Sequence, residues 1–114
     1  MGYCRAVRAG QHVYVTGTAP VGEDGKVVAP GDGYLQAKRC LEIIGRALTD
    51  LGAGFESVVR TRMFVTDISL WPSFGRAHRE VFGDHPPATT MVEIRGLIDP
   101  DMLIEIEADA VVPS

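Results

Sequence analysis

Three carboxylates near the C-terminal end of the chain have the spacing that places side chains on one face of a β-strand. In "LIEIEADA", residues 103–110, Glu105, Glu107 and Asp109 alternate with isoleucine and alanine. Like charges at this spacing repel one another unless something compensates them. The residues alone leave three interpretations open: hydration, pairing with a cation, or a working site. A metal site is not predicted, because hard cations take oxygen ligands that converge from several elements.

No other catalytic or cofactor-binding motif accompanies this row. His12, His78 and His85 form no HExxH motif and no close pair, so a zinc site is not predicted. GxSxG, P-loop and GxGxxG patterns are absent, and no cofactor is predicted. We expect His78 on a solvated helix face and His85 in a proline-rich loop that could line a cleft.

Composition and charge narrow the class of protein. The chain has 114 residues, 46% of them hydrophobic, and a net charge of −4, which is typical of one soluble globular domain, here spanning 1–114. This charge disfavours nucleic acid and anionic membranes as partners. No apolar run reaches the ~20 residues of a membrane span, and no signal peptide is predicted. Cys4 and Cys40 lack a CxxC spacing, so we expect two reduced thiols in a cytoplasmic protein, with Cys40 in a helix core.

The first half of the chain predicts a hairpin followed by a helix. The segment 12–19 is rich in β-formers, and a short strand at about 4–8 is expected to pair with it. After the turn residues of "APGDG", one apolar stripe repeats at spacings of three and four from Ala37 to Leu51. Gly52 supplies the expected stop of this helix.

The second half predicts a strand, a helix and two further strands. Residues 57–67 alternate as a strand, with Val59 on the same side as Thr61. Ser69 is expected to cap a helix that has Pro72 in its first turn and runs to about Phe82. Strands are expected at 88–96 and 102–112. The order β-β-α-β-α-β-β predicts an α+β fold with both helices on one face of a sheet.

The sheet face without helices is expected to meet another subunit. Two helices cover only one face, and the acidic row is assigned to the other, together with Thr89, Met91, Glu93 and Arg95. A face that mixes apolar and charged groups in this way favours a symmetric oligomer. Cross-strand pairing with Arg60, Arg62 or Arg95 would relieve the repulsion within the row.

Four segments together resemble one known family. "VYVTGTAP", "VVRTRMFVTDI", "PPATTMVEI" and "LIEIEADAVV" have the order and nearly the spacing of the RidA (YjgF) family of reactive-intermediate deaminases, from about Tyr3 to Val112. The resemblance implies a chorismate-mutase-like fold. It also implies a homotrimer with a central barrel of sheets, helices outside, and a small-molecule cleft between each pair of subunits.

The resemblance also implies a site. Family members with the full motif hydrolyse 2-imino acids to keto acids and ammonia; an arginine grips the substrate carboxylate and a glutamate positions the attacking water. Carried over residue by residue, the glutamate falls on Glu105 and a cleft tyrosine on Tyr3. A hydroxyl–glycine pair falls on Thr16 and Gly17, and the residue two beyond the arginine on Met91.

The arginine itself falls on Thr89, which assigns the chain to an arginine-lacking subgroup. Losing a charge-assisted bidentate contact costs about 10²-fold in binding. Arg95 lies about 20 Å further along an extended strand and cannot replace it. Arg5, Arg62 or an arginine of a neighbouring subunit are the remaining candidates for this anchor. A second departure is Gly75, where active members commonly have asparagine.

Three functions stay open on the sequence alone. The first is a hydrolase (deaminase-like), not the standard 2-iminobutanoate/2-iminopropanoate deaminase, that acts on an imine or enamine without an essential carboxylate, or on another small electrophile, with water activated by Glu105. The second is a non-catalytic trimer that binds a small metabolite in the same cleft. The third, endoribonuclease activity, is disfavoured by the acidic charge and by the lack of an aromatic and basic strip.

Overall fold

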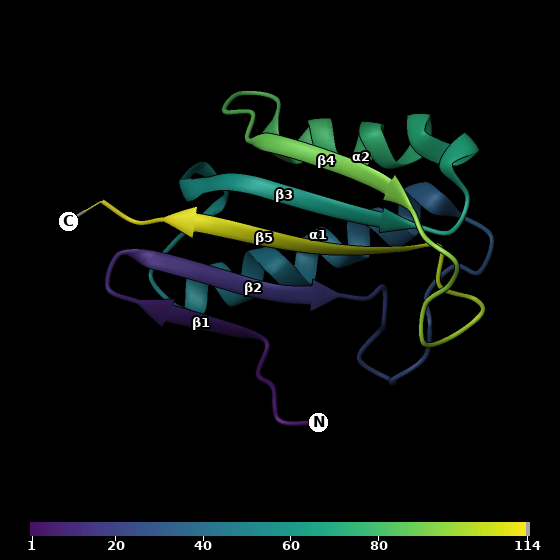
Figure 1. Ribbon diagram of the computed structural model, residues 1–114, viewed down its shortest axis with the longest axis horizontal. Coiled ribbons are helices and arrows are strands. Elements are labelled where there is room, and N and C mark those ends of the chain that lie inside the picture. Colours follow the sequence, from purple (N-terminus) through teal and green to yellow (C-terminus); the bar gives the residue numbers. More distant parts are fainter. Residues whose placement is uncertain (114) are drawn as a thin grey trace.

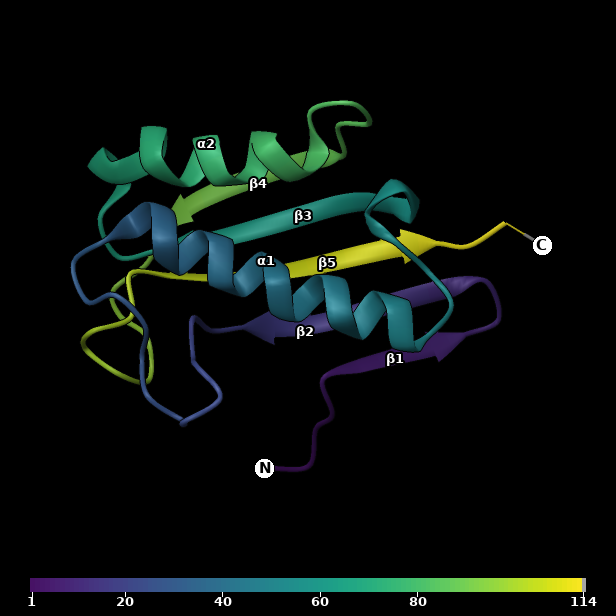
Figure 2. The same cartoon turned by 180° about the vertical axis from the view of Figure 1, so that it is seen from behind.

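Five strands form one sheet in the computed structural model, which describes residues 1–113 (Figure 1). The strands are β1 (Ala6–Ala9), β2 (His12–Thr18), β3 (Val58–Val65), β4 (Ala88–Glu93) and β5 (Ile104–Val111). Their order is β1-β2-β5-β3-β4, and all neighbours are antiparallel except β3 and β4. The helices α1 (Gly33–Asp50) and α2 (Trp71–Phe82) both lie on one face, as Figure 2 shows. The predicted α+β fold is therefore confirmed.

The strict alternation of the last strand places it at the centre of this sheet. On the helix side of β5, Ile104 and Ile106 are fully buried and Ala108 and Ala110 nearly so. The two alanines leave room for the strand to lie close beneath α1, which crosses β5 and β2. The acidic residues of β5 consequently face away from the helices, as the sequence predicts.

Local signals set the ends of α1. The Asp32 side chain accepts a hydrogen bond from the backbone N–H of Leu35 at 3.0 Å and so caps the first turn. Gly52 has φ +80°, a left-handed conformation that glycine adopts at low cost, and it ends the helix as predicted. The apolar stripe between them is buried, including Cys40 at 0% exposure.

Gln36, buried on the same helix, ties α1 to the start of β5. Its amide nitrogen donates to the carbonyl oxygens of Val28, at 3.1 Å, and Asp101, at 2.9 Å. Its side-chain oxygen accepts from the backbone N–H of Leu103 at 2.8 Å. These bonds satisfy buried backbone groups and fix the loop that leads into Glu105.

The alternation of β3 departs from the prediction at its first residues. Val58 is 5% exposed and Val59 is 50% exposed, although the sequence predicts Val59 on the same side of the strand as Thr61, which the structure buries. A β-bulge between Val58 and Arg60, where β3 pairs with β5, inserts one residue and turns Val58 inward. Beyond the bulge, β3 alternates as predicted.

The cap predicted at Ser69 is also wrong. The Asp67 side chain accepts a hydrogen bond from the backbone N–H of Ser69 at 3.0 Å and caps a 3₁₀ turn at Ile68–Leu70. Helix α2 follows this turn, with Pro72 in its first turn as predicted.

The predicted face of β4 is wrong. Thr89 pairs with buried Thr61, and their Oγ1 atoms lie 2.9 Å apart on the helix side of the sheet. Met91 and Glu93, which alternate with the outward positions, share this side. Arg95 lies beyond the end of β4 and belongs to no strand. Four of the residues assigned to the open face therefore do not lie on it.

Neither helix of residues 1–113 combines the length and the apolar character that a bilayer span requires.

Candidate functional site

Four of the predicted site residues meet in one hollow of about 320 Å³. Its lining residues come from the end of β2, the start of β5 and the N-terminal segment, and Figure 1 shows where these three parts of the chain lie. The residues that line it are Met1, Tyr3, Arg5, Thr16, Gly17, Ala19, Ile98 and Glu105. The structure thus brings Tyr3, Thr16, Gly17 and Glu105 together, as the resemblance implies.

The contact between Gly17 and Glu105 shapes this hollow. A Cβ atom added at Gly17 would collide with the Glu105 carboxylate and would lie 3.1 Å from its Cδ. Gly17 sits in a bulge of β2, where the pairing with β5 shifts between Val15 and Thr18. Only glycine at this position leaves room for the half-buried carboxylate to lie against the backbone of β2.

Arg5 is the cationic side chain of the hollow, and β2 holds it in place. Its Nη1 donates to the Gly17 carbonyl oxygen at 3.2 Å and to Thr18 Oγ1 at 3.0 Å. The ring centroid of Tyr3 lies 6.0 Å from the Arg5 Cζ. Arg5 and Glu105 do not form an ion pair within residues 1–113.

Thr89 and Met91 lie elsewhere. They are on β4, two strands away from Glu105 and on the opposite face of the sheet. Met91 is half-buried and packs against the core. One copy of the chain therefore does not unite all six predicted residues.

Thr89 is instead part of a hydroxyl–imidazole cluster. Thr61 Oγ1 lies 2.9 Å from Thr89 Oγ1 and 2.9 Å from His78 Nε2, and the Thr89 hydroxyl donates to the Pro87 carbonyl at 3.2 Å. Burial lowers the pKa of His78 below its ordinary value of 6.5. The position where the resemblance expects a guanidinium is thus occupied by uncharged hydrogen-bonding groups.

The prediction of a solvated His78 is wrong, because the ring is half-buried and packs on Phe82 with centroids 4.6 Å apart. No sequence signal joins His78 to Thr61 and Thr89, since three different elements supply them. His85 is exposed and does not line the hollow.

The rest of the acidic row is paired. Arg62 Nη1 donates to Glu107 Oε1 at 3.0 Å and to Asp109 Oδ2 at 3.3 Å across the β3–β5 ladder. The predicted relief by a cross-strand arginine is confirmed for Arg62. The same contacts commit Arg62 to these two carboxylates and leave Glu105 as the member of the row that faces the hollow.

The two thiols differ in environment. Cys40 is fully buried, as predicted, and its thiol lies 3.9 Å from the Ile104 carbonyl oxygen. Burial, followed by the negative charge of Glu105, raises the pKa of the Cys40 thiol well above its ordinary value. Cys4 is exposed and follows Tyr3 in the sequence.

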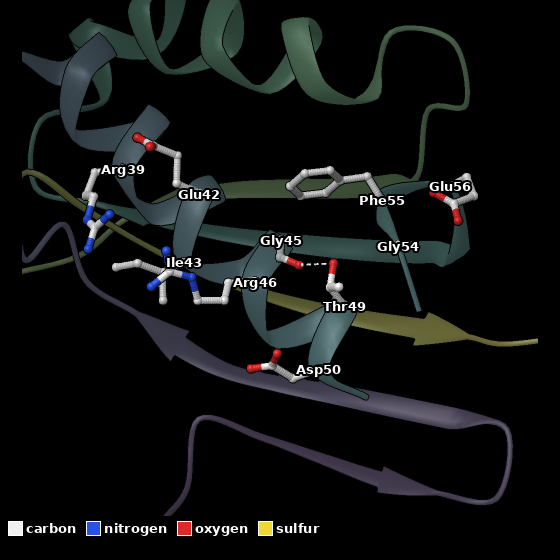
Figure 3. Close-up of a pocket in the computed structure, with 10 residues that line it drawn as sticks. All are labelled: Arg39, Glu42, Ile43, Gly45, Arg46, Thr49, Asp50, Gly54, Phe55 and Glu56. Carbon is white, nitrogen blue, oxygen red and sulfur yellow. Dashed lines mark hydrogen bonds between the residues drawn. The ribbon is translucent and has the colours of Figure 1, made fainter. Parts of the chain in front are cut away.

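Another hollow, of about 810 Å³, lies on the outer side of α1 against the 3₁₀ turn Phe55–Ser57 (Figure 3). Its charged side chains have mixed sign and are spread along the rim, and Phe55 packs over Gly45 at its centre. This is a groove between a solvent-facing helix and a turn. The acidic side chains at positions 105, 107 and 109 lie on the opposite face of the sheet from this groove.

A metal-binding cluster does not appear in residues 1–113, where no three acidic, histidine or cysteine side chains converge.

The sequence is similar to one protein family and to a relative with a named activity. Residues 1–112 match the protein family described as Endoribonuclease L-PSP. The chain is 34% identical to the 3-aminoacrylate deaminase RutC of Acinetobacter baylyi over 108 residues, which cover 95% of this chain and 85% of that protein.

Solved structures of other proteins have a similar fold. Rv2704 of Mycobacterium tuberculosis, a member of the YjgF/YER057c/UK114 family, superposes with a TM-score of 0.88 at 46% identity, covering 97% of this chain and 87% of that one. TdcF of E. coli, solved with bound serine, gives a TM-score of 0.90 at 26% identity, covering 99% and 90%.

Proposed function

Because the chain belongs to the Endoribonuclease L-PSP family, which includes the YjgF/RidA proteins, we propose that it hydrolyses a small imine, enamine or related electrophile with water activated by Glu105. The observation that carries this proposal is the half-buried Glu105 carboxylate, held against Gly17 in a hollow with Thr16 and Tyr3. The relative named as a deaminase and the relative solved with serine support a small polar ligand.

The hydrolysis needs one base and a few hydrogen-bonding groups. Glu105 accepts a proton from water as the oxygen attacks the C=N carbon, and it passes this proton to the nitrogen, which gives a carbinolamine. The proton of the new hydroxyl group then moves to the amino nitrogen, again through Glu105; the C–N bond breaks, ammonia leaves and the carbon becomes a carbonyl. The Thr16 hydroxyl and the backbone N–H of Gly17 orient the substrate. No cofactor takes part.

The full site needs a second copy of the chain. Thr89 and Met91 lie on the opposite face from Glu105, so a cleft with all six residues takes Glu105 from one subunit and Thr89 from its neighbour. The open face also exposes apolar side chains, among them Val7, Tyr14 and Val92 at 51%, 49% and 42%. A homotrimer with the sheets inside covers this face and forms three such clefts.

The threonine at position 89, where active members of the family have arginine, favours a second candidate function. Without the arginine that grips a substrate carboxylate, the same cleft serves equally as a non-catalytic site that binds a small metabolite. The two functions share the trimer and differ in whether Glu105 acts on water.

Hydrolysis of an imine generated in situ by an amino-acid oxidase, with the residual imine trapped by semicarbazide, separates these two functions. We expect the wild type to accelerate the loss of imine and Glu105→Gln to lower the rate by about 10²-fold or more, because the general base is removed. Glu107→Gln is the matched control, since Glu107 shares the strand face but pairs with Arg62. A silent wild type that remains a folded oligomer contradicts the hydrolysis of 2-imino acids.

The variant Thr89→Arg then tests whether the rest of the cleft still supports hydrolysis once the arginine of the family is restored. If the wild type is silent and this variant gains activity, the cleft is a family site adjusted to another ligand. If both are silent, the binding function is favoured, and Gly75 becomes the next position to change.

A further inference from the structure

We propose that Arg5 is the anion-binding residue of the Glu105 hollow and takes the place of the arginine that is absent at position 89. This inference rests on the proposed function of the same hollow and names the group that sets its ligand class: a small molecule with a carboxylate or similar anion at one end. Arg62 cannot serve, because it is paired with two carboxylates, and Arg95 lies in the loop beyond β4.

The hydrogen bonds of Arg5 fix one nitrogen and leave one edge of the guanidinium available. Nη1 donates to the Gly17 carbonyl oxygen and to Thr18 Oγ1, and the Thr18 hydroxyl donates in turn to the Thr16 carbonyl at 2.8 Å. Nε and Nη2 donate to no protein group within residues 1–113. These two nitrogens form the edge that binds a carboxylate in bidentate fashion, and the fixed Nη1 orients it in advance.

Arg5 and Glu105 approach Gly17 from two sides without pairing. Arg5 contacts the Gly17 carbonyl oxygen, and the Glu105 carboxylate lies where a Cβ of Gly17 would be. Both side chains are half-buried. Water therefore screens each charge only in part, and each can attract a ligand more strongly than a fully exposed group would. The hollow therefore presents a cation and a carboxylate at separate points, and a ligand that spans them places its anion at Arg5 and its reacting centre at Glu105.

Binding of pyruvate and of its neutral amide, pyruvamide, tests Arg5 without any catalytic step. Titrations followed by NMR shifts of the protein are expected to show tighter binding of pyruvate to the wild type. Arg5→Gln is expected to weaken pyruvate binding by about 10- to 100-fold and to change pyruvamide binding by less than about 2-fold, because only the charge-assisted contact is lost. Arg8→Gln is the matched control, since Arg8 also bonds backbone carbonyls but lies outside the hollow.

Arg5→Lys covers the case in which loss of the Nη1 bonds unfolds the glutamine variant. It keeps the charge without the planar edge, and we expect it to retain a preference for pyruvate that is smaller than that of the wild type. Equal affinity of the wild type for pyruvate and pyruvamide overturns the proposal, as does unchanged pyruvate binding in a folded Arg5→Gln. Because imine hydrolysis is measured separately, either result leaves the hydrolase standing, and a silent hydrolysis assay leaves the binding test of Arg5 intact.

Discussion

The candidate site depends on the lack of a side chain at Gly17. The Glu105 carboxylate occupies the space of its absent Cβ, and its carbonyl oxygen accepts a hydrogen bond from Arg5. The two charged groups of the hollow are therefore positioned by one residue in a β-bulge. A glycine in a strand often marks such a close approach.

The two cysteines are expected to react at very different rates. Cys4 is exposed, whereas Cys40 is buried and its raised pKa keeps it protonated. A thiol-specific chromogenic reagent should titrate one thiol in the native protein and two after denaturation. Cys4→Ser should leave no fast-reacting thiol, and rapid labelling of that variant would contradict the burial of Cys40.

Protonation of His78 is expected to destabilise the fold at low pH. Because burial lowers its pKa in the folded state, the unfolded chain binds the proton more tightly, and His78 contributes its full stability above the ordinary pKa of 6.5. This contribution is lost as the pH falls from 6.5 through the lower pKa of the folded state. The free energy of unfolding, measured by urea titration from pH 5 to 8, should therefore rise with pH more steeply in the wild type than in His78→Gln.

His85→Gln is the control for this titration. It removes an exposed histidine that lies outside the cluster of His78, Thr61 and Thr89, and so controls for the loss of a histidine as such. Equal slopes in the wild type and His78→Gln would place His78 in solvent, as the sequence predicts.

At the scale of the elements, two helical glycines have opposite surroundings. In α1, a Cβ at Gly45 would lie 2.6 Å from Cζ of Phe55, which packs across the helix (Figure 3). In α2, a Cβ at Gly75 would meet nothing closer than Trp71, at 4.0 Å. Glycine at position 45 therefore leaves room for Phe55 of the turn that follows α1, whereas no neighbouring group requires glycine at position 75 in α2.

Alanine at these two positions is expected to change stability in opposite directions. Gly75→Ala should raise the free energy of unfolding by up to about 1 kcal/mol, the ordinary helix preference of alanine over glycine. Gly45→Ala should lower it, because the clash with Phe55 exceeds the same gain. Thermal unfolding of both variants checks this, and the added substitution Phe55→Ala should remove the penalty of Gly45→Ala. A stabilised Gly45→Ala would show that Phe55 moves aside freely.

At the scale of the whole molecule, the six predicted site residues fall into two groups on opposite faces of the sheet. Glu105 and its neighbours open to one side, and Thr89 and Met91 lie beside α2 on the other. A sheet is rigid, so one copy cannot bring the groups together by a small movement. The proposed cleft requires that the groups come from different subunits.

Subunit mixing is expected to reveal this shared cleft. Glu105→Gln removes the base, and Thr89→Trp blocks the second half of the cleft, so each variant alone should be inactive in imine hydrolysis. Random trimers formed from equal amounts of both should recover about one quarter of the wild-type activity, because one cleft in four combines two intact halves. The activity is measured after unfolding and refolding the mixture, with the trimer verified by analytical ultracentrifugation.

The control mixture combines Glu105→Gln with the double variant Glu105→Gln/Thr89→Trp. It contains no cleft with a base and should stay inactive. If the first mixture also stays inactive while both parents are trimers, the site does not cross the subunit boundary.

The sequence by itself determined the elements of this fold and the direction of the acidic row. The alternation at 103–110 and the apolar stripe of α1 are strong local patterns, and burial of one face follows directly from them. The similarity of four segments to one family also named Tyr3, Thr16 and Gly17, three of the residues that line the hollow with Glu105. These signals are carried by neighbouring residues, so no tertiary contact was needed to interpret them.

Only the tertiary structure decided which face β4 presents and which groups surround Thr89. Thr89 and Thr90 are chemically alike, so an edge strand with this sequence has no hydrophobic alternation to set its register. The bulges at Val58 and Gly17, the cluster of His78 with two threonines, and the approach of Arg5 to Gly17 all join residues from separate elements. Such contacts depend on where the chain returns in space, which local spacing does not encode.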